Sequence, residues 1–203
     1  MDSYIGKMYN RISEAPESRS FVVSDFTDIM DYETAKKNIA RLQKNGTLRR
    51  VIRGVYDKPK YSKLIDEYAA PDINEVALAL ARNYNWTIAP SGNTALNLLG
   101  LSTQVPANWN YISTGPYRSY NIGNMKLQFS HRANKTIEGM SWKTAMVIEA
   151  LKEIGKESVD EKTIAILQSR LSKGDKELLL SEGRQTTAWI YSIIKMICED
   201  MSE

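Results

Sequence analysis

The sequence YETAKKNIARLQKNGTLRRVIRGVYDKPK, residues 32–60, decides the fold of the N-terminal part of this chain. It holds nine lysines and arginines against two acidic residues, a local net charge of +7 in a chain whose total is +3. Asn45-Gly46 is typical of a helix end, and Gly54 separates two runs of β-prone residues. We therefore predict one helix followed by a two-stranded hairpin, both basic.

The expected helix has two unlike sides. Ala35, Ile39 and Leu42 recur at the spacing of one apolar helix face, and the opposite side is polar. An apolar back with a polar front is typical of the recognition helix of a helix-turn-helix protein, which enters the major groove of DNA. The arginines of the hairpin would contact phosphates or the minor groove. The predicted DNA-binding residues are Thr34, Lys36, Lys37, Asn38, Arg41, Lys44, Arg49, Arg50 and Arg53.

The residues before this stretch predict two more helices. Ile5, Met8 and Ile12 form one stripe of a helix over Tyr4 to Glu14, and Ser24 can cap a brief helix carrying Phe26. Asp31 can cap the basic helix itself. Three helices followed by a hairpin predict a winged helix-turn-helix domain over residues 1–61. A basic surface that binds no nucleic acid is the alternative, and the agreement of charge, helix order and glycines favours DNA.

The middle of the chain predicts a small α+β unit. Residues 59–72 are expected to be a linker with a short helical piece, followed by a helix over residues 74–84. Ser91 can cap a further helix. Residues 109–113 and 126–130 alternate as strands, and Asn121 and Gly123 indicate turns between them.

The chain after Ser141 is expected to be helical. Residues 142–154 form the first of these helices, and Ser158 to Glu161 has the form of a capping box that opens the next helix. The last helix carries an apolar stripe: Ile190, Ile193, Ile194, Ile197 and Met201. Core packing explains this stripe better than a partner-binding face.

The predicted fold class is α+β, with a winged helix-turn-helix, a small α+β unit and a C-terminal helical region. The second domain is residues 62–203.

Composition restricts the class of protein. Residues 1–61 carry a net charge of +4 and residues 62–203 a net charge of −1, which predicts a nucleic-acid-binding head on a nearly neutral body. The apolar runs are too short to span a bilayer, and the N-terminus lacks the features of a signal peptide. The single cysteine, Cys198, excludes an intrachain disulfide. We expect a cytoplasmic protein that contacts no membrane.

The sequence lacks the parts that an enzyme would need. One histidine, His131, and one cysteine cannot build a His/Cys zinc site, and no phosphate-binding glycine motif is present. Ser91-Gly92-Asn93 has a faint likeness to the start of a nucleotidyltransferase site, but no paired aspartates follow to hold metal ions. We predict no enzyme activity, cofactor or metal; a nucleotidyltransferase-like body is the alternative.

Three blocks of the sequence together resemble the AbiEi-type antitoxins of type IV abortive-infection toxin–antitoxin systems. The first is Ile39 to Arg50 with Arg53 to Tyr56. The second is Ala89 to Ser102, and the third pairs Tyr111 to Gly115 with Leu127 to Arg132. The blocks span roughly residues 1–135, and the pairing of the first with the second is the more specific part of the resemblance.

The resemblance implies a two-function protein. Its winged helix would bind operator repeats in double-stranded DNA and repress its own operon. Its C-terminal body would oppose a nucleotidyltransferase-like toxin without forming a stable complex with it. A winged-helix regulator whose body senses a ligand or dimerises, with no toxin partner, is the alternative. The oligomeric state stays open.

Overall fold

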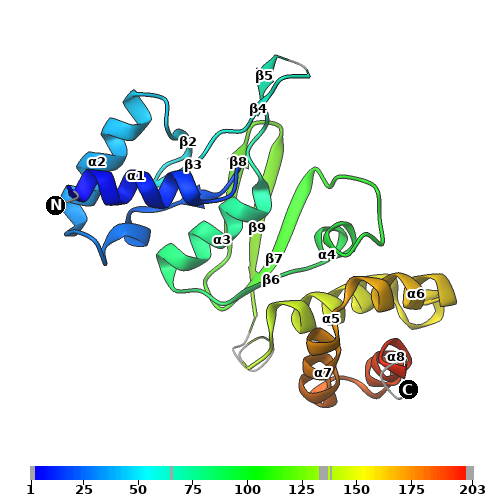
Figure 1. The fold of residues 1–203 in the computed structure, drawn as a ribbon. Helices are drawn as coiled ribbons and strands as arrows, with labels where there is room; N and C mark the ends of the chain where they lie inside the picture. Colours follow the sequence, from blue (N-terminus) through cyan, green and yellow to red (C-terminus); the bar gives the residue numbers. More distant parts are fainter. Residues whose placement is uncertain (1–2, 65, 133–136, 138, 200–203) are drawn as a thin grey trace. The chain divides into compact units, whose positions relative to one another are not determined.

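The computed structural model describes residues 3–64, 66–132, 137 and 139–199, and shows an α+β protein (Figure 1). The chain divides into two compact units, Met1–Trp86 and Thr87–Glu203.

The first unit opens with α1 (Tyr4–Glu14), which has the predicted bounds. Its start is fixed because the Ser3 hydroxyl accepts a hydrogen bond from the Gly6 amide. Met8 and Ile12 are buried on its inner side. The predicted amphipathic helix is confirmed.

A short strand and a short helix follow α1. Strand β1 (Ser20–Phe21) leads into the 3₁₀-helix η1 (Val23–Phe26), and the Asp25 carboxylate accepts from the Val22 amide at 3.0 Å. The brief helix that we predicted is therefore present, but it is a single 3₁₀ turn that begins one residue before Ser24.

Helix α2 (Tyr32–Lys44) is the basic helix predicted from the sequence. Asp31 caps it by accepting from the Thr34 amide at 3.0 Å. Gly46 follows its end with φ +80°, the left-handed conformation that glycine adopts without strain. The residues predicted to begin and to end this helix, Asp31 and Asn45-Gly46, thus lie at its two ends.

The predicted hairpin is also present. Strands β2 (Arg49–Ile52) and β3 (Val55–Asp57) pair antiparallel around Arg53-Gly54, with Gly54 at φ +83°. Strand β1 adds to the other side of β3, so the sheet order is β1-β3-β2. The core of this unit lies among α1, η1, α2 and the sheet, and its buried residues are Met8, Ile12, Phe21, Val23, Phe26, Met30, Ala35, Ile39, Leu42 and Leu48.

The predicted linker contains a second hairpin in place of a helical piece. Strands β4 (Tyr61–Ser62) and β5 (Glu67–Tyr68) pair antiparallel, and the rings of Tyr61 and Tyr68 meet edge to face with centroids 5.2 Å apart. Each of these strands is only two residues long, so it cannot show the alternation of apolar and polar residues by which a strand is recognised in a sequence.

Helix α3 (Ile73–Tyr84) completes the first unit and packs on β1, β3 and η1. The Arg82 guanidinium binds both carboxylate oxygens of Asp25 and the Ser20 carbonyl. The compact unit therefore extends beyond residue 61. The assignment of DNA binding to residues 1–61 stays a prediction.

The second unit contains a four-stranded sheet of order β6-β7-β9-β8. Its strands are β6 (Ile88–Pro90), β7 (Asn108–Ser113), β8 (Arg118–Ile122) and β9 (Met125–His131). The two predicted strands are neighbours, β7 parallel to β9. The segment 118–122, predicted as turn-rich, is instead a strand that pairs with β9 around Gly123-Asn124.

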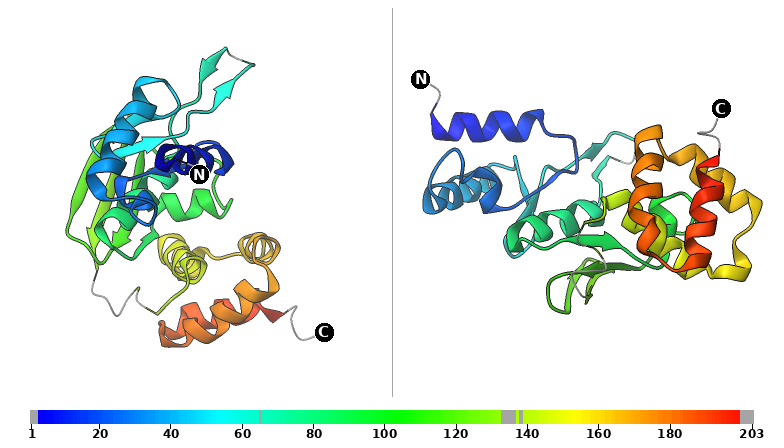
Figure 2. Two further views of the ribbon diagram at one scale, coloured as in Figure 1. Left: turned by 60° about the vertical axis from the view of Figure 1, so that its left-hand side comes forward. Right: turned by 90° about the horizontal axis from the view of Figure 1, so that it is seen from below.

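Helices complete the second unit. They are α4 (Asn93–Leu98), α5 (Trp142–Ile154), η3 (Lys156–Ser158), α6 (Glu161–Arg170), α7 (Lys173–Glu182), η4 (Gly183–Gln185) and α8 (Ala188–Ile197). Helices α4 and α5 pack on the sheet, and α7 and α8 pack on α5 and on each other. The second view in Figure 2 shows α6, α7 and α8 at one end of this unit.

Two predicted helix starts need correction. Gly92, not Ser91, is the N-cap of α4. The cap of α6 is Asp160, whose carboxylate accepts from the Thr163 amide at 2.8 Å, so Ser158 does not open that helix. The core reading of the last helix is confirmed for Ile190, Ile194 and Ile197, which are buried; Met201 lies outside the described residues.

Candidate nucleic-acid interface

The outer side of α2 carries most of the predicted contacts. Thr34, Lys37, Arg41 and Lys44 recur at the spacing of one helix face, and the three cations are exposed. Thr34 is half-buried, and its amide donates to the cap Asp31. Among the residues that the structure describes, Lys37, Arg41 and Lys44 make no ion pair, so their charges are available to a partner.

Lys36 lies on another side of the same helix. Its ammonium is 3.8 Å from the Glu33 carboxylate, and both side chains are more than 60% exposed. A pair this exposed contributes little to stability and competes weakly with other anions. Lys36 is therefore peripheral to the row formed by Lys37, Arg41 and Lys44.

Asn38 does not share the exposed side that we predicted for it. Its side chain is buried, and its amide nitrogen donates to the Met30 sulfur at 3.3 Å. Residue 38 lies at the border between the polar row and the apolar face that includes Leu42, and its side chain is buried in the core. The expected outward position is wrong because spacing alone does not decide a border position.

Arg49 is bound inside the protein. Its Nε donates to Asp57 at 3.0 Å, its Nη2 donates to the second Asp57 oxygen, and its Nη1 donates to the Ala69 carbonyl at 2.8 Å. The Asp57 side chain is fully buried. Arg49 and Asp57 are direct partners across β2 and β3, so this arginine links the wing to the chain that follows β5.

Arg50 and Arg53 remain exposed on the wing. Arg53 precedes the turn glycine, and Arg50 lies on β2 opposite Tyr56. In the described part of the chain neither guanidinium has an ion-pair partner. Together with Lys37, Arg41 and Lys44 they form what we call the cationic row, five exposed cations on α2 and the wing.

A groove adjoins this row, and sequence reasoning missed it. It has a volume of about 450 Å³ and lies between the end of α2, strand β2 and strand β5. Gln43, Arg50, Pro59 and Tyr68 line it. The only signal in the sequence was the pair of tyrosines at 61 and 68, which cannot be recognised as cross-strand partners before the hairpin is known.

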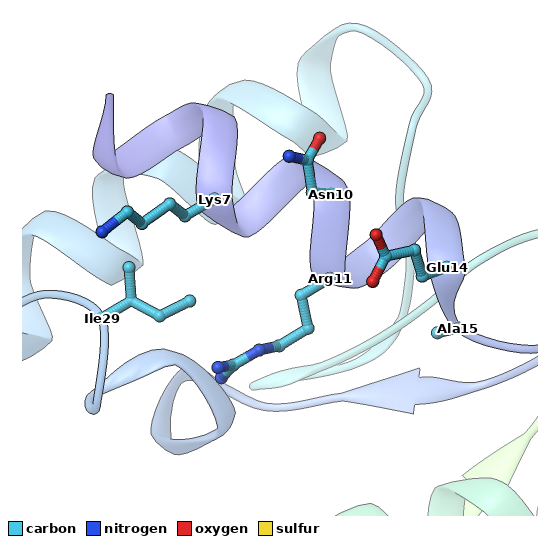
Figure 3. Close-up of a pocket in the computed structure, with 6 residues that line it drawn as sticks. All are labelled: Lys7, Asn10, Arg11, Glu14, Ala15 and Ile29. Atoms are coloured by element: carbon cyan, nitrogen blue, oxygen red, sulfur yellow. The ribbon is translucent and has the colours of Figure 1, made fainter. Parts of the chain in front are cut away.

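A second groove, of about 510 Å³, lies beside α1 (Figure 3). Its lining combines Lys7 and Arg11 with Glu14 and Ile29. Arg11 is held by two hydrogen bonds of 2.7 Å to Asp28 and one to the Asp25 carbonyl, and the Asp28 carboxylate raises the pKa of the arginine. Arg11 is engaged, and the charge of Lys7 is offset by that of Glu14 on the same helix, so the groove has no surplus charge to attract an anion.

The residues considered for enzyme chemistry lie apart. His131 is exposed at the end of β9, with Nδ1 3.0 Å from the Gly115 carbonyl. Cys198 is buried beside α7. Within the described ranges, no three His, Cys, Asp or Glu side chains are grouped so that they could hold a metal ion. The helices of that same part of the chain include none long and apolar enough to cross a membrane.

The order α1-β1-η1-α2-β2-β3, with β1 and β2 on either side of β3, matches a winged helix-turn-helix. The class is thus an α+β protein with such an arrangement at its N-terminus. The chain belongs to the family of unknown function DUF6088, whose model matches residues 7–179.

Two further comparisons complete this placement. No curated protein matches the chain. Among solved structures, the chain is similar to the crystal structure of the RV2827C protein from Mycobacterium tuberculosis, with a TM-score of 0.40 and 12% sequence identity. The match covers 98% of this chain and 78% of that one.

Proposed function

We propose that the protein binds double-stranded DNA through its N-terminal winged helix-turn-helix. The observation that carries the proposal is the cationic row: five exposed cations without ion-pair partners in the described residues, on a helix and hairpin ordered as in DNA-binding proteins. Helix α2 would enter the major groove with Arg41 toward the bases. Arg50 and Arg53 would contact the backbone or the minor groove.

The dependence of binding on salt tests this proposal. If all five cations of the row neutralise phosphates, log K falls against log salt with a slope of about −4 to −5. Binding is measured by fluorescence anisotropy on a 40-base-pair duplex from the region upstream of the protein's own gene and on an unrelated duplex of that length. A near-flat dependence on both duplexes would sink the proposal.

Two single substitutions distinguish contacts with the bases from contacts with the DNA backbone. Arg41→Ala is expected to reduce the preference for the upstream duplex over the unrelated one. Arg50→Ala should weaken both duplexes alike and reduce the salt slope by about 1. Equal effects of the two substitutions on preference would contradict the assignment of Arg41 to the bases.

The resemblance to AbiEi-type antitoxins supports a finer proposal. The protein would repress its own operon, and residues 62–203, with no catalytic activity of their own, would oppose a nucleotidyltransferase-like toxin encoded beside it. Co-expression of the neighbouring gene with and without this chain, scored by growth, tests neutralisation. A neighbour that is harmless alone would favour a regulator whose body senses a ligand or dimerises.

A further inference from the structure

The β4–β5 hairpin projects from the first unit beside the wing, as the views in Figures 1 and 2 agree. Its two strands are closed by the Ala69 amide, which donates to the Lys60 carbonyl at 2.8 Å. The edge-to-face rings of Tyr61 and Tyr68 cover one side of it, and the Tyr61 hydroxyl is bound by Asp66. The two strands are therefore held together by cross-strand contacts of their own.

Arg49 fixes this hairpin to the wing. Two of its nitrogens hold the buried Asp57 carboxylate of β3, and the third holds the Ala69 carbonyl directly after β5. A shift of the hairpin relative to the wing would break the hydrogen bond from Arg49 to the Ala69 carbonyl, which is strengthened by the charge of its donor. The two hairpins thus keep a defined spacing.

The groove of about 450 Å³ is the space that this spacing leaves open. Its lining includes Arg50, Gln43 and Tyr68, together with the apolar ring of Pro59. A guanidinium pairs with a phosphate, amide and phenol groups donate hydrogen bonds to phosphate oxygens, and apolar groups contact deoxyribose. Arg50 also belongs to the cationic row, so the groove continues the proposed DNA surface.

We propose, resting on the DNA-binding function proposed above, that β4–β5 is a second wing and that the groove holds the sugar-phosphate backbone of one DNA strand. The second wing adds no positive charge, because residues 61–68 hold Lys63 against Asp66 and Glu67 and carry a net charge of −1. Its contribution is hydrogen bonding and sugar contact through Tyr68 and Gln43. Affinity therefore depends on Tyr68, but the salt slope does not.

The test uses the full chain and the same 40-base-pair upstream duplex. Tyr68→Ala is expected to weaken binding about fivefold to tenfold with an unchanged salt slope, and Tyr68→Phe, which keeps the ring, about threefold. Arg50→Ala changes the slope as well as the affinity. Tyr9→Ala is the matched control, because Tyr9 is 50% exposed on α1, outside the groove, against 61% for Tyr68.

A tethered cleavage reagent supplies a second readout. The only native cysteine, Cys198, is buried, so an iron chelate on Lys63→Cys marks the hairpin alone. Radical cleavage of the duplex beside the site protected by the wing is expected. A parent protein that binds neither duplex overturns both proposals. A parent that binds, with Tyr68→Ala equally tight or with no cleavage from residue 63, overturns the second wing only.

Discussion

Arg49 and Arg50 are adjacent residues of equal charge with opposite surroundings. Arg49 is held by a buried carboxylate and a carbonyl, whereas Arg50 lies exposed in a groove. The sequence predicted both as DNA contacts because it shows charge, but the pairing of Arg49 with Asp57 depends on strand register. Asn38 was misplaced for a similar reason, since its position borders two helix faces.

Substitution separates the two arginines. Arg49→Ala leaves the fully buried Asp57 carboxylate without its ionic partner and is expected to lower the free energy of unfolding by about 3 kcal/mol. Arg50→Ala should change it by less than about 0.5 kcal/mol, because nothing in the described protein binds that side chain. Urea unfolding followed by circular dichroism measures both; similar losses for the two variants would refute the distinction.

At the scale of elements, the sequence predicted best those helices whose ends carry explicit signals. Helices α1, α2 and α5 have the predicted bounds because Ser3, Asp31 and Ser141 cap them ahead of periodic apolar residues. The strands that were missed, β1, β4, β5 and β8, are short or largely polar, so alternation gives no signal for them. Their pairing is decided by neighbours distant in sequence.

Two glycines test how the elements are built. Gly54→Ala in the wing meets no atom within 4 Å, but it places a side chain at φ +83° and should cost about 1 kcal/mol of stability. Gly174 in α7 also has open space, without a positive φ, so Gly174→Ala should stabilise by up to about 1 kcal/mol. Thermal unfolding measures both variants, and a midpoint temperature that shifted in the same direction for the two would contradict this explanation.

At the scale of the whole molecule, the sequence predicted a basic head and a neutral body but not where the first compact unit ends. The charge pattern stops near residue 61, whereas packing continues through α3, because Arg82 binds Asp25 and Ser20. The distribution of charge indicates which surface binds a partner, whereas buried contacts define a compact unit. The end of the basic segment and the end of the first unit therefore need not coincide.

Acid should weaken the second unit at the contact between α5 and α7. Hydrogen bonds from Lys143 and Ser172 lower the pKa of Asp175 to about 2. Burial opposes the same shift at Glu182, but bonds to Thr144 and Ser141 outweigh it and lower that pKa too. Because these folded-state pKa values lie below the ordinary ones, the stabilisation is present at neutral pH and is lost as pH falls.

The measurement is thermal unfolding between pH 7 and pH 2. The parent is expected to lose about 1 kcal/mol through Asp175 between roughly pH 5 and pH 2, after allowance for solvent screening. Asp175→Asn should be less stable at pH 7 and lose less on acidification. A variant with the same acid dependence as the parent would show that another group is responsible.

The link from Arg49 to Asp57 also has an evolutionary consequence. A buried ion pair can be exchanged for two apolar side chains at little cost, but the loss of one member alone is strongly unfavourable. In an alignment of DUF6088 sequences, positions 49 and 57 should therefore covary, changing together or not at all, while position 50 drifts among cations independently of both. Seven residues separate the coupled positions, a spacing by which a wing of this construction could be recognised in a sequence alone.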